Sequence, residues 1–402
     1  MNKKNNLAIL APEAVYPANT GGRIVVFNKI KYLLKNGYNV TLFCIVDSDE
    51  EAKVQDVAMA KLGVKSYSYN RNTFKKRNLI NTLKYPYAVA SRDNEKLKQD
   101  LRALVEQDCL DVIDIEFPQM AVNILDIDII REKKINIILN QHNIEYRAMR
   151  SISKALHNPV KHAIFQFEAS RLKKFEEKIY NSGLVNGYTF VSMEDLRIFR
   201  EEHPQIKIPC KVFSIGAEDH GDVAHSDSSN VVIVGKMSYQ PNIEGVLWFY
   251  QSVWPIVKKS CPDSKLYIVG KDPVESLTEI DDKSVVVTGT VDSVEPYYAN
   301  SAVVAIPIFS GGGVKTKLIE AASYGLPIIT TPSGVLGTNF TNEQQVIVTE
   351  DPVEFAQGIV AALDNDQHQQ DLAKNAHDLF VKEYTWSGIC QQMSEFFENL
   401  VE

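Results

Sequence analysis

Two lysines and a glutamate follow a run of glycines, and residues of these types could bind a phosphorylated ligand. Residues 311–313 are all glycine, and Lys315, Lys317 and Glu320 follow. Glycine adopts backbone angles that other residues avoid and lets a ligand approach the main chain. A helix that starts after such a loop offers free N–H groups and partial positive charge to an anion. The pattern indicates a diphosphate site with a carboxylate for sugar hydroxyls; a plain strand-to-helix connection is the alternative.

Two further candidates lie where predicted strands end. His142 stands in the polar run Gln-His-Asn-Ile-Glu at 141–145, after an apolar strand over 135–140, and Gly22 opens a helix after the first strand. Open α/β sheets bind ligands beyond the carboxyl ends of their strands. We therefore expect His142 in binding or catalysis, with a structural histidine as the alternative. Gly22 would let the backbone approach a ligand, with an ordinary helix start as the alternative.

Two series of alternating strands and helices must position these residues. Short β-branched runs predict strands, apolar residues at helical spacing predict helices, and the loop-rich stretches 204–210 and 216–230 separate the two series. Two tandem β/α series predict an α/β protein with two Rossmann-like domains and a cleft between them. The predicted strands are 7–11, 39–46, 64–69, 110–117, 135–140, 186–192, 231–234, 266–270, 285–288, 302–307, 326–330 and 346–348. The main predicted helices are 24–34, 50–62, 147–180 (two, divided near Asn158-Pro159), one starting at Ser192, 246–254, 295–299, one around 318–322, 352–364, 367–382 and 386–400.

Length and composition agree with two soluble domains. The chain has 402 residues with 45% hydrophobic content, too many for one typical core. No apolar run approaches the ~18–20 residues of a membrane span, and the first apolar run is too short for a signal peptide. The five cysteines are dispersed without a C-x-x-C pair, which suggests reduced thiols and a cytoplasmic protein.

Charge is distributed unevenly between the two halves. Residues 1–200 hold 31 Lys and Arg against 23 Asp and Glu, whereas residues 201–402 hold 12 against 28. A basic N-terminal half could face an anionic surface such as phospholipid headgroups; two differently solvated domains are the alternative. The basic and aromatic stretch 71–89 is a candidate membrane or acceptor contact, or else a solvated loop. Outside that stretch no basic stripe interleaves with stacking aromatics, which argues against nucleic acid.

Metal and other catalytic motifs are weak or absent in the sequence. Asp126-Ile-Asp128 has the form of a metal-binding D-x-D motif, which needs a hydrophobic strand and a single-domain context, but the tandem β/α series argues against that context. No His/Cys spacing fits zinc, and no G-x-S-x-G or Walker loop occurs. We expect no metal.

Together the motifs resemble the GT-B glycosyltransferases of family 4, in particular a bacterial subgroup that builds surface polysaccharides. The resemblance covers nearly the whole chain, and its most specific block is 311–327. The other matching motifs are Gly21-Gly22, the run 141–146, Val191–Asp195, Gly235-Lys236, Pro241-Asn242 and 266–270.

The resemblance implies retaining sugar transfer from a nucleotide-sugar, UDP- or GDP-linked, without a metal or other cofactor. It implies a GT-B fold with an acceptor-side domain over 1–208, a donor-binding domain over 209–385, and a C-terminal helix, about 386–402, that returns to the first domain. His142 and Glu320 would be catalytic, with His142 beside the transferred sugar and Glu320 on the ribose. The implied donor-binding positions are Gly22, Lys236, Thr290, Val291, Gly312, Gly313, Val314, Lys315, Thr316, Lys317 and Glu320.

Two positions depart from the family pattern. The first glutamate of its E-x7-E motif, which touches the donor sugar, would fall at Gly312, and the lysine expected after Lys236 is matched by Glu244. Lysine provides a point charge rather than the two-pronged contact of arginine, and no arginine follows Arg200. Recognition of the diphosphate in the C-terminal half must therefore use lysines and main-chain N–H groups.

The resulting hypothesis is a glycosyltransferase acting on a glycan, lipid-linked or protein-linked acceptor in bacterial cell-surface polysaccharide or glycoconjugate synthesis. We expect it in the cytoplasm, at the inner face of the membrane. The missing glutamate motivates one alternative, a catalytically weak subunit that binds a partner during assembly. A sugar-nucleotide epimerase of the same fold is a second alternative, but it would want several carboxylates around the sugar, and none is found near Gly312.

Overall fold

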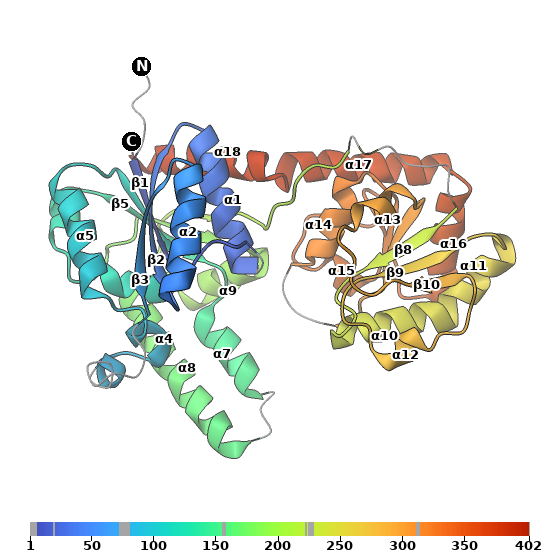
Figure 1. Ribbon diagram of the computed structural model, residues 1–402, viewed down its shortest axis with the longest axis horizontal. Coiled ribbons are helices and arrows are strands. Elements are labelled where there is room, and N and C mark those ends of the chain that lie inside the picture. The colour runs from blue at the N-terminus through green and yellow to red at the C-terminus, as the bar shows by residue number, and fades with distance from the viewer. Residues whose placement is uncertain are drawn as a thin grey trace. The chain divides into compact units, whose positions relative to one another are not determined.

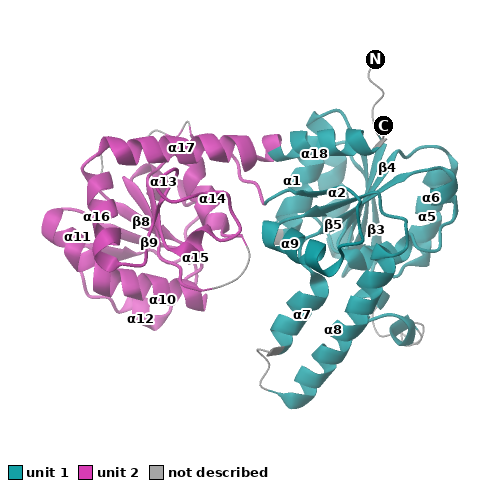
Figure 2. Ribbon diagram, turned by 180° about the vertical axis from the view of Figure 1, so that it is seen from behind, with its two compact units in different colours: residues 1–214, 389–402 teal, residues 215–388 magenta. Residues whose placement is uncertain are grey.

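The computed structural model describes residues 6–18, 21–71, 81–154, 158–221, 223, 229–310 and 314–401. The chain forms two compact units, shown in separate colours in Figure 2. Unit 1 comprises residues 1–214 and 389–402, and unit 2 comprises residues 215–388. The boundaries expected from the sequence were 208/209 and 385/386.

Unit 1 is built on one parallel seven-stranded sheet in the order β3-β2-β1-β4-β5-β6-β7. Its central strands are buried and apolar on both faces, as parallel strands covered by helices must be. Successive residues of β1 point to opposite cores: Ala8 and Leu10 pack in one, and Leu7 and Ile9 in the other. The strands are β1 Asn6–Ala11, β2 Asn39–Val46, β3 Lys65–Asn70, β4 Val112–Glu116, β5 Asn136–Gln141, β6 Gly187–Phe190 and β7 Cys210–Val212.

Helices cover both faces of this sheet (Figure 1). The last helix, α18, returns to unit 1, as the expected fold class requires. Its Ser394 Oγ accepts a hydrogen bond from Asn36 Nδ2 at 3.0 Å, and Phe397 packs edge-on against Tyr38. The helical segments are α1 Gly21–Lys35, α2 Asp49–Lys61, α4 Tyr87–Ala90, α5 Glu95–Glu106, the 3-10 turn Pro118–Asn123, α6 Ile129–Glu132, α7 Glu145–Lys154, α8 Pro159–Tyr180, α9 Met193–Glu202 and α18 Trp386–Val401.

Unit 2 repeats this topology with six parallel strands, in the order β10-β9-β8-β11-β12-β13. The strands are β8 Val231–Val234, β9 Leu266–Val269, β10 Val285–Val287, β11 Val303–Ile306, β12 Ile328–Thr330 and β13 Ile347–Val348. The helices are α10 Gln240–Trp248, α11 Trp254–Ser260, α12 Glu275–Thr278, α13 Glu295–Ala299, α14 Thr316–Ser323, α15 Pro332–Val335, α16 Pro352–Leu363 and α17 Gln367–Glu383.

Both sheets follow the strand order 3-2-1-4-5-6 of a doubly wound fold, which confirms the expected pair of Rossmann-like domains. Two local predictions were incomplete. The helix expected over 246–254 is present but starts earlier, at Gln240, and continues through a π-helical turn, Phe249–Val253, into α11. The loop expected over 204–210 is present up to residue 209, but the strand β7, which begins at Cys210 and pairs with Tyr188 of β6, was not predicted.

Within the described part of the chain, no helix is long and apolar enough to cross a membrane.

Candidate active site

Each sheet reverses its strand order once, and the predicted site residues lie beside these two points. The reversal falls between β1 and β4 in unit 1, and between β8 and β11 in unit 2. The loops beyond the carboxyl ends of such strands form the crevice where open α/β sheets bind ligands. In unit 2, Gly235 directly follows β8. In unit 1, Phe117 and His142 directly follow β4 and β5.

In unit 2, Asn242 joins three of the motifs found in the sequence. Its Nδ2 donates to the carbonyl oxygen of Lys236 at 2.8 Å, and its Oδ1 accepts from Lys317 Nζ at 2.7 Å. A Cβ added at Gly235 would lie 2.8 Å from Asn242 Nδ2 and 3.2 Å from Lys317 Nζ. Only glycine therefore leaves room for the start of α10 and the lysine of α14 at the end of β8.

The two lysines at the start of α14 are held in an unfavourable electrostatic environment. Burial lowers the pKa of Lys317 to about 8, with a further contribution from the nearby charge of Lys315, while Glu320 opposes the shift. Burial also lowers the pKa of Lys315. Lys315 precedes the helix as its N-cap without a capping hydrogen bond from its side chain. A dianionic group here would favour both charged ammonium groups and lie at the positive end of the helix.

Glu320 lies in the second turn of α14 and is supported by an aromatic stack. Burial raises the pKa of its carboxyl group, whereas the Tyr298 hydroxyl and Lys317 act in the opposite direction. The rings of Tyr298 and Tyr324 stack with centroids 4.3 Å apart, and His220 stacks on Tyr324 at 4.5 Å. The sequence analysis missed this stack. The spacing of Glu320 and Tyr324, four residues apart on one helix, was a signal that could have revealed part of it.

The remaining predicted donor positions have different outcomes. The side chain of Lys236 is exposed, and only its carbonyl oxygen joins the Asn242 contact. Thr290 and Val291 lie in the segment between β10 and α13, and no described contact brings them to Lys317 or Glu320. Gly312 and Gly313 lie outside the described residues. Val314 and Thr316 flank Lys315 at the start of α14.

Glu244, the second departure from the family pattern, faces solvent. Its side chain is exposed on α10 and accepts a hydrogen bond from Gln240 Nε2 at 2.9 Å. It therefore places no negative charge beside Lys317.

In unit 1, a buried cation connects two strand carboxylates. Lys29 of α1 is fully buried and contacts Asp114 Oδ2 at 2.8 Å and Glu116 Oε1 at 2.5 Å. Burial alone would lower the pKa of Lys29, but the two carboxylates outweigh it and raise the pKa. Asn140 Nδ2 donates to the other oxygen of Asp114 at 3.1 Å. The carboxyl end of β4 is thus held by a saturated polar network.

Glu116 also orients His142. Its second oxygen, Oε2, lies 2.7 Å from His142 Nε2, so Nε2 carries the proton and Nδ1 is left as an acceptor. The imidazole stacks flat on Phe117, with centroids 4.1 Å apart. Phe117 adopts φ +69°, a left-handed conformation that is strained for an aromatic residue. The chain turns at Phe117, directly after β4, and this turn places the Phe117 ring against His142.

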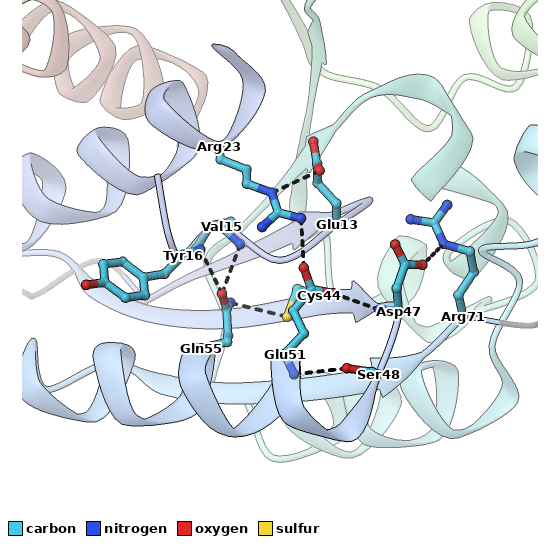
Figure 3. Close-up of polar contacts among 10 residues, drawn as sticks. All are labelled: Glu13, Val15, Tyr16, Arg23, Cys44, Asp47, Ser48, Glu51, Gln55 and Arg71. Carbon is cyan, nitrogen blue, oxygen red and sulfur yellow. Dashed lines mark hydrogen bonds and ion pairs between the residues drawn. The ribbon is translucent and has the colours of Figure 1, made fainter. Parts of the chain in front are cut away.

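Gly22 lies at the same edge of unit 1. A Cβ there would be 3.5 Å from Glu13 Oε1 and 3.8 Å from Phe117 Cζ. Figure 3 shows the contacts that hold the neighbouring loop. Arg23 forms ion pairs with Glu13 at 3.1 Å and with Glu51 at 2.7 Å. Gln55 Oε1 accepts hydrogen bonds from the main-chain N–H groups of residues 15 and 16. The structure therefore brings Gly22 to the ring that supports His142.

Among the described residues, no group of three His, Cys, Asp or Glu side chains could hold a metal ion. Asp126 and Asp128 are exposed in the connection between β4 and β5.

Comparison with known proteins identifies the fold and the class of activity. A model of the family described as glycosyl transferases group 1 matches residues 228–365. The uncharacterized 44.6 kDa protein in the cps region of Klebsiella pneumoniae is 24% identical over 397 residues, which cover 94% of this chain and 96% of that protein.

Two solved structures illustrate the fold. Anabaena Alr3699/HepE, solved with UDP, has a TM-score of 0.59 at 12% identity and covers 98% of this chain and 100% of its own. WaaG, a glycosyltransferase involved in lipopolysaccharide biosynthesis, has a TM-score of 0.57 at 11% identity and covers 97% of this chain and 99% of its own. The chain thus has the GT-B fold, and the match over residues 228–365 identifies it as a glycosyltransferase.

Proposed function

We propose that the protein is a retaining glycosyltransferase that uses a nucleoside diphosphate-sugar. The acceptor would be a hydroxyl group of a glycan, lipid-linked or protein-linked molecule in bacterial cell-surface polysaccharide or glycoconjugate synthesis. The similarity to a protein of a cps region and to a lipopolysaccharide glycosyltransferase supports this setting. The HepE structures with UDP and with UDP-glucose support the donor class.

The observation that carries the proposal is the contact of Lys317 with Asn242, beside Gly235 and Glu320. A lysine whose pKa is lowered to about 8 by burial, next to a second lysine and a helix start, is suited to a diphosphate. Glu320 lies one turn further along the same helix, where a carboxylate can accept hydrogen bonds from ribose hydroxyls. Lys236, Thr290 and Val291 remain proposed donor contacts.

The proposed chemistry needs the leaving diphosphate to be stabilised as its charge grows. Lys315, Lys317 and the first N–H groups of α14 supply fixed positive potential where that charge develops. A phosphate oxygen would take the proton of the acceptor hydroxyl as the acceptor attacks from the side that the diphosphate leaves. His142 Nδ1, left free by the contact of Nε2 with Glu116, would accept a hydrogen bond from a hydroxyl of the transferred sugar.

We also propose that transfer proceeds without a metal ion. The proposal is tested by adding EDTA and then Mg²⁺ or Mn²⁺ to the transfer reaction, and loss of activity restored by one of these metals would contradict it.

Donor binding tests the function directly. UDP, GDP and ADP are added separately while thermal unfolding is followed, and at least one should raise the unfolding temperature in a saturable way. Lys317→Ala and Glu320→Ala should lose this protection, whereas Lys374→Ala, an exposed lysine of α17, should keep it. A screen of UDP-, GDP- and ADP-sugars by mass spectrometry would then identify the transferred group.

The same experiment separates the two alternatives. Absence of protection by every nucleotide would reject the transferase proposal and favour a partner-binding subunit. Conversion of a sugar nucleotide to its epimer, without hydrolysis or transfer, would favour the epimerase.

A further inference from the structure

The outer half of the α7–α8 helix pair exposes apolar side chains that the proposed reaction does not use. These two helices lie side by side and extend away from the sheet of unit 1 (Figures 1 and 2). Every buried residue of α8 lies between Ala169 and Tyr180, so its first ten residues, 159–168, pack against no core. The contact of Ser153 Oγ with the carbonyl oxygen of His162 at 3.2 Å joins the two helices near their outer ends.

The exposed apolar residues lie along one line of α8. Val160, Ile164 and Phe167 follow the spacing i, i+4, i+7, which places them on one helix face. They are 66, 54 and 64% exposed, and Ile152 at the outer end of α7 is 54% exposed. Single exposed apolar residues are common on soluble proteins, but an aligned set of this size marks an interaction surface.

A groove extends the apolar surface toward the sheet. Its volume is about 660 Å³, within the range of small-molecule sites. It runs between α8 and the α4 segment, with Tyr87, Met149, Ile164 and Phe167 among its lining residues. Leu83, which precedes α4, is exposed, and its carbonyl oxygen accepts a hydrogen bond from Arg171 of α8 at 3.2 Å. The apolar surface is therefore continuous over three segments of unit 1.

The charge around this surface is positive. Residues 148–168 contain three Lys and Arg but a single acid, Glu168. That acid is already engaged: its carboxylate accepts from Arg171 NH1 at 2.7 Å and from the main-chain N–H of Tyr87 at 2.6 Å. Lys161 is exposed beside the apolar line, whereas Arg147, at the inner end of α7, pairs with Glu202 at 2.6 Å. Apolar residues on one helix face with cations around them are typical of helices that lie in the interface of an anionic bilayer.

We propose that the outer half of the α7–α8 pair, with α4, inserts into the surface of an anionic lipid bilayer. Val160, Ile164 and Phe167 enter the acyl boundary, and the surrounding lysines and arginines contact lipid phosphates. Of the stretch 71–89, only Leu83 and Tyr87 then take part, at the edge of this contact. Residues 72–80 of that stretch lie outside the described part of the chain. This inference does not depend on the identity of the donor.

Vesicle flotation of the full chain tests the proposal. The protein should float with vesicles that contain phosphatidylglycerol, far less with pure phosphatidylcholine, and less in high salt because screening weakens the attraction. The double variant Ile164→Asp/Phe167→Asp should reduce the bound fraction at least tenfold. The matched control Val353→Asp/Val381→Asp replaces two exposed valines of unit 2 and should bind like wild type.

A second measurement shows which part of the protein enters the bilayer. Phe167→Trp should show a blue shift of its fluorescence on addition of phosphatidylglycerol vesicles. Failure of the wild type to bind these vesicles, or equal binding by both double variants, would overturn the proposal. So would a wild-type dimer that the Ile164→Asp/Phe167→Asp change dissociates without any vesicle binding, since the surface would then join two copies. Nucleotide protection of the double variant, measured in parallel, shows whether the donor site is intact.

Discussion

Glu116 connects the buried ion pair of unit 1 to the candidate catalytic histidine. One carboxylate oxygen contacts Lys29, and the other contacts His142 Nε2. A buried lysine or carboxylate is costly unless its partners are present, so Lys29 and Glu116 hold each other in place. The position of Lys29 on α1 thereby fixes the proton position on a histidine that follows β5.

The lowered pKa of Lys317 predicts a pH dependence of nucleotide binding. Free Lys317 loses its proton above about pH 8, whereas a bound diphosphate favours the protonated form. Binding above that pH therefore requires proton uptake, and affinity should fall about tenfold between about pH 7 and pH 9. Calorimetric titrations of the wild type and Lys374→Ala should both show this decline. Equal affinity at the two pH values would contradict the role of Lys317.

The buried Glu176 predicts a pH dependence of stability. Burial, with the charge of Glu145, raises the pKa of its carboxyl to about 8, whereas an unfolded glutamate titrates near pH 4.3. Between these values the folded state holds a proton that the unfolded state has lost, so stability falls as pH rises through this window. Glu176→Gln removes the titration. The free energy of unfolding of this variant minus that of the wild type should therefore increase by on the order of 2–5 kcal/mol from about pH 5 to pH 8.

Urea denaturation at the two pH values measures this difference. Glu177→Gln, at the neighbouring and more exposed position, should change stability by a similar small amount at both pH values. A difference for Glu176→Gln that does not grow with pH would show that Glu176 is ionised in the folded protein.

At the level of elements, the sequence was most informative where local chemistry decides the structure. Ser192 caps α9 by accepting from the Asp195 N–H, and Asn158 caps α8 at the predicted division between the two helices. The turn after Phe117 and the three-residue strand β7 were not predicted, because both depend on tertiary neighbours rather than on periodicity. For the site, the glycine and lysine motifs were visible in the sequence. The Lys29 network was not, because its partners lie 85 and 87 residues away.

Gly245 shows how closely α10 approaches the strand loop beside the proposed donor site. A Cβ there would lie 1.6 Å from the main-chain oxygen of Pro307, directly after β11. Gly245→Ala must therefore displace α10, and with it Asn242, which holds Lys317. We expect a loss of about 3 kcal/mol or more in the free energy of unfolding, because backbone cannot yield as a side chain can.

Chemical denaturation with and without nucleotide measures this change. Glu244→Ala, at the exposed neighbour on the same helix, should cost less than about 0.5 kcal/mol. Wild-type stability of Gly245→Ala would show that α10 can move without cost.

At the scale of the whole molecule, the two units have separate cores. Within the described residues, the two clusters of unit 1 and the two clusters of unit 2 share no residue. The chain nevertheless passes from unit 2 back to unit 1 in α18, whose Ile389, Met393 and Phe397 complete the core beside α1. Unit 1 therefore needs the last residues of the chain, whereas the match to the glycosyl transferases group 1 family, at residues 228–365, lies within unit 2.

Separate cores predict two unfolding transitions that respond to different changes. Phe397→Ala empties a site that is 1% exposed in unit 1 and should cost about 3–5 kcal/mol, lowering only the transition of that unit. Phe355→Ala, fully buried in unit 2, is the matched variant and should lower only the other transition. A nucleoside diphosphate held by Lys317 and Glu320 should raise the transition that Phe355→Ala lowers. Differential scanning calorimetry resolves the two transitions, and a single transition moved equally by both variants and by nucleotide would show that the units unfold together.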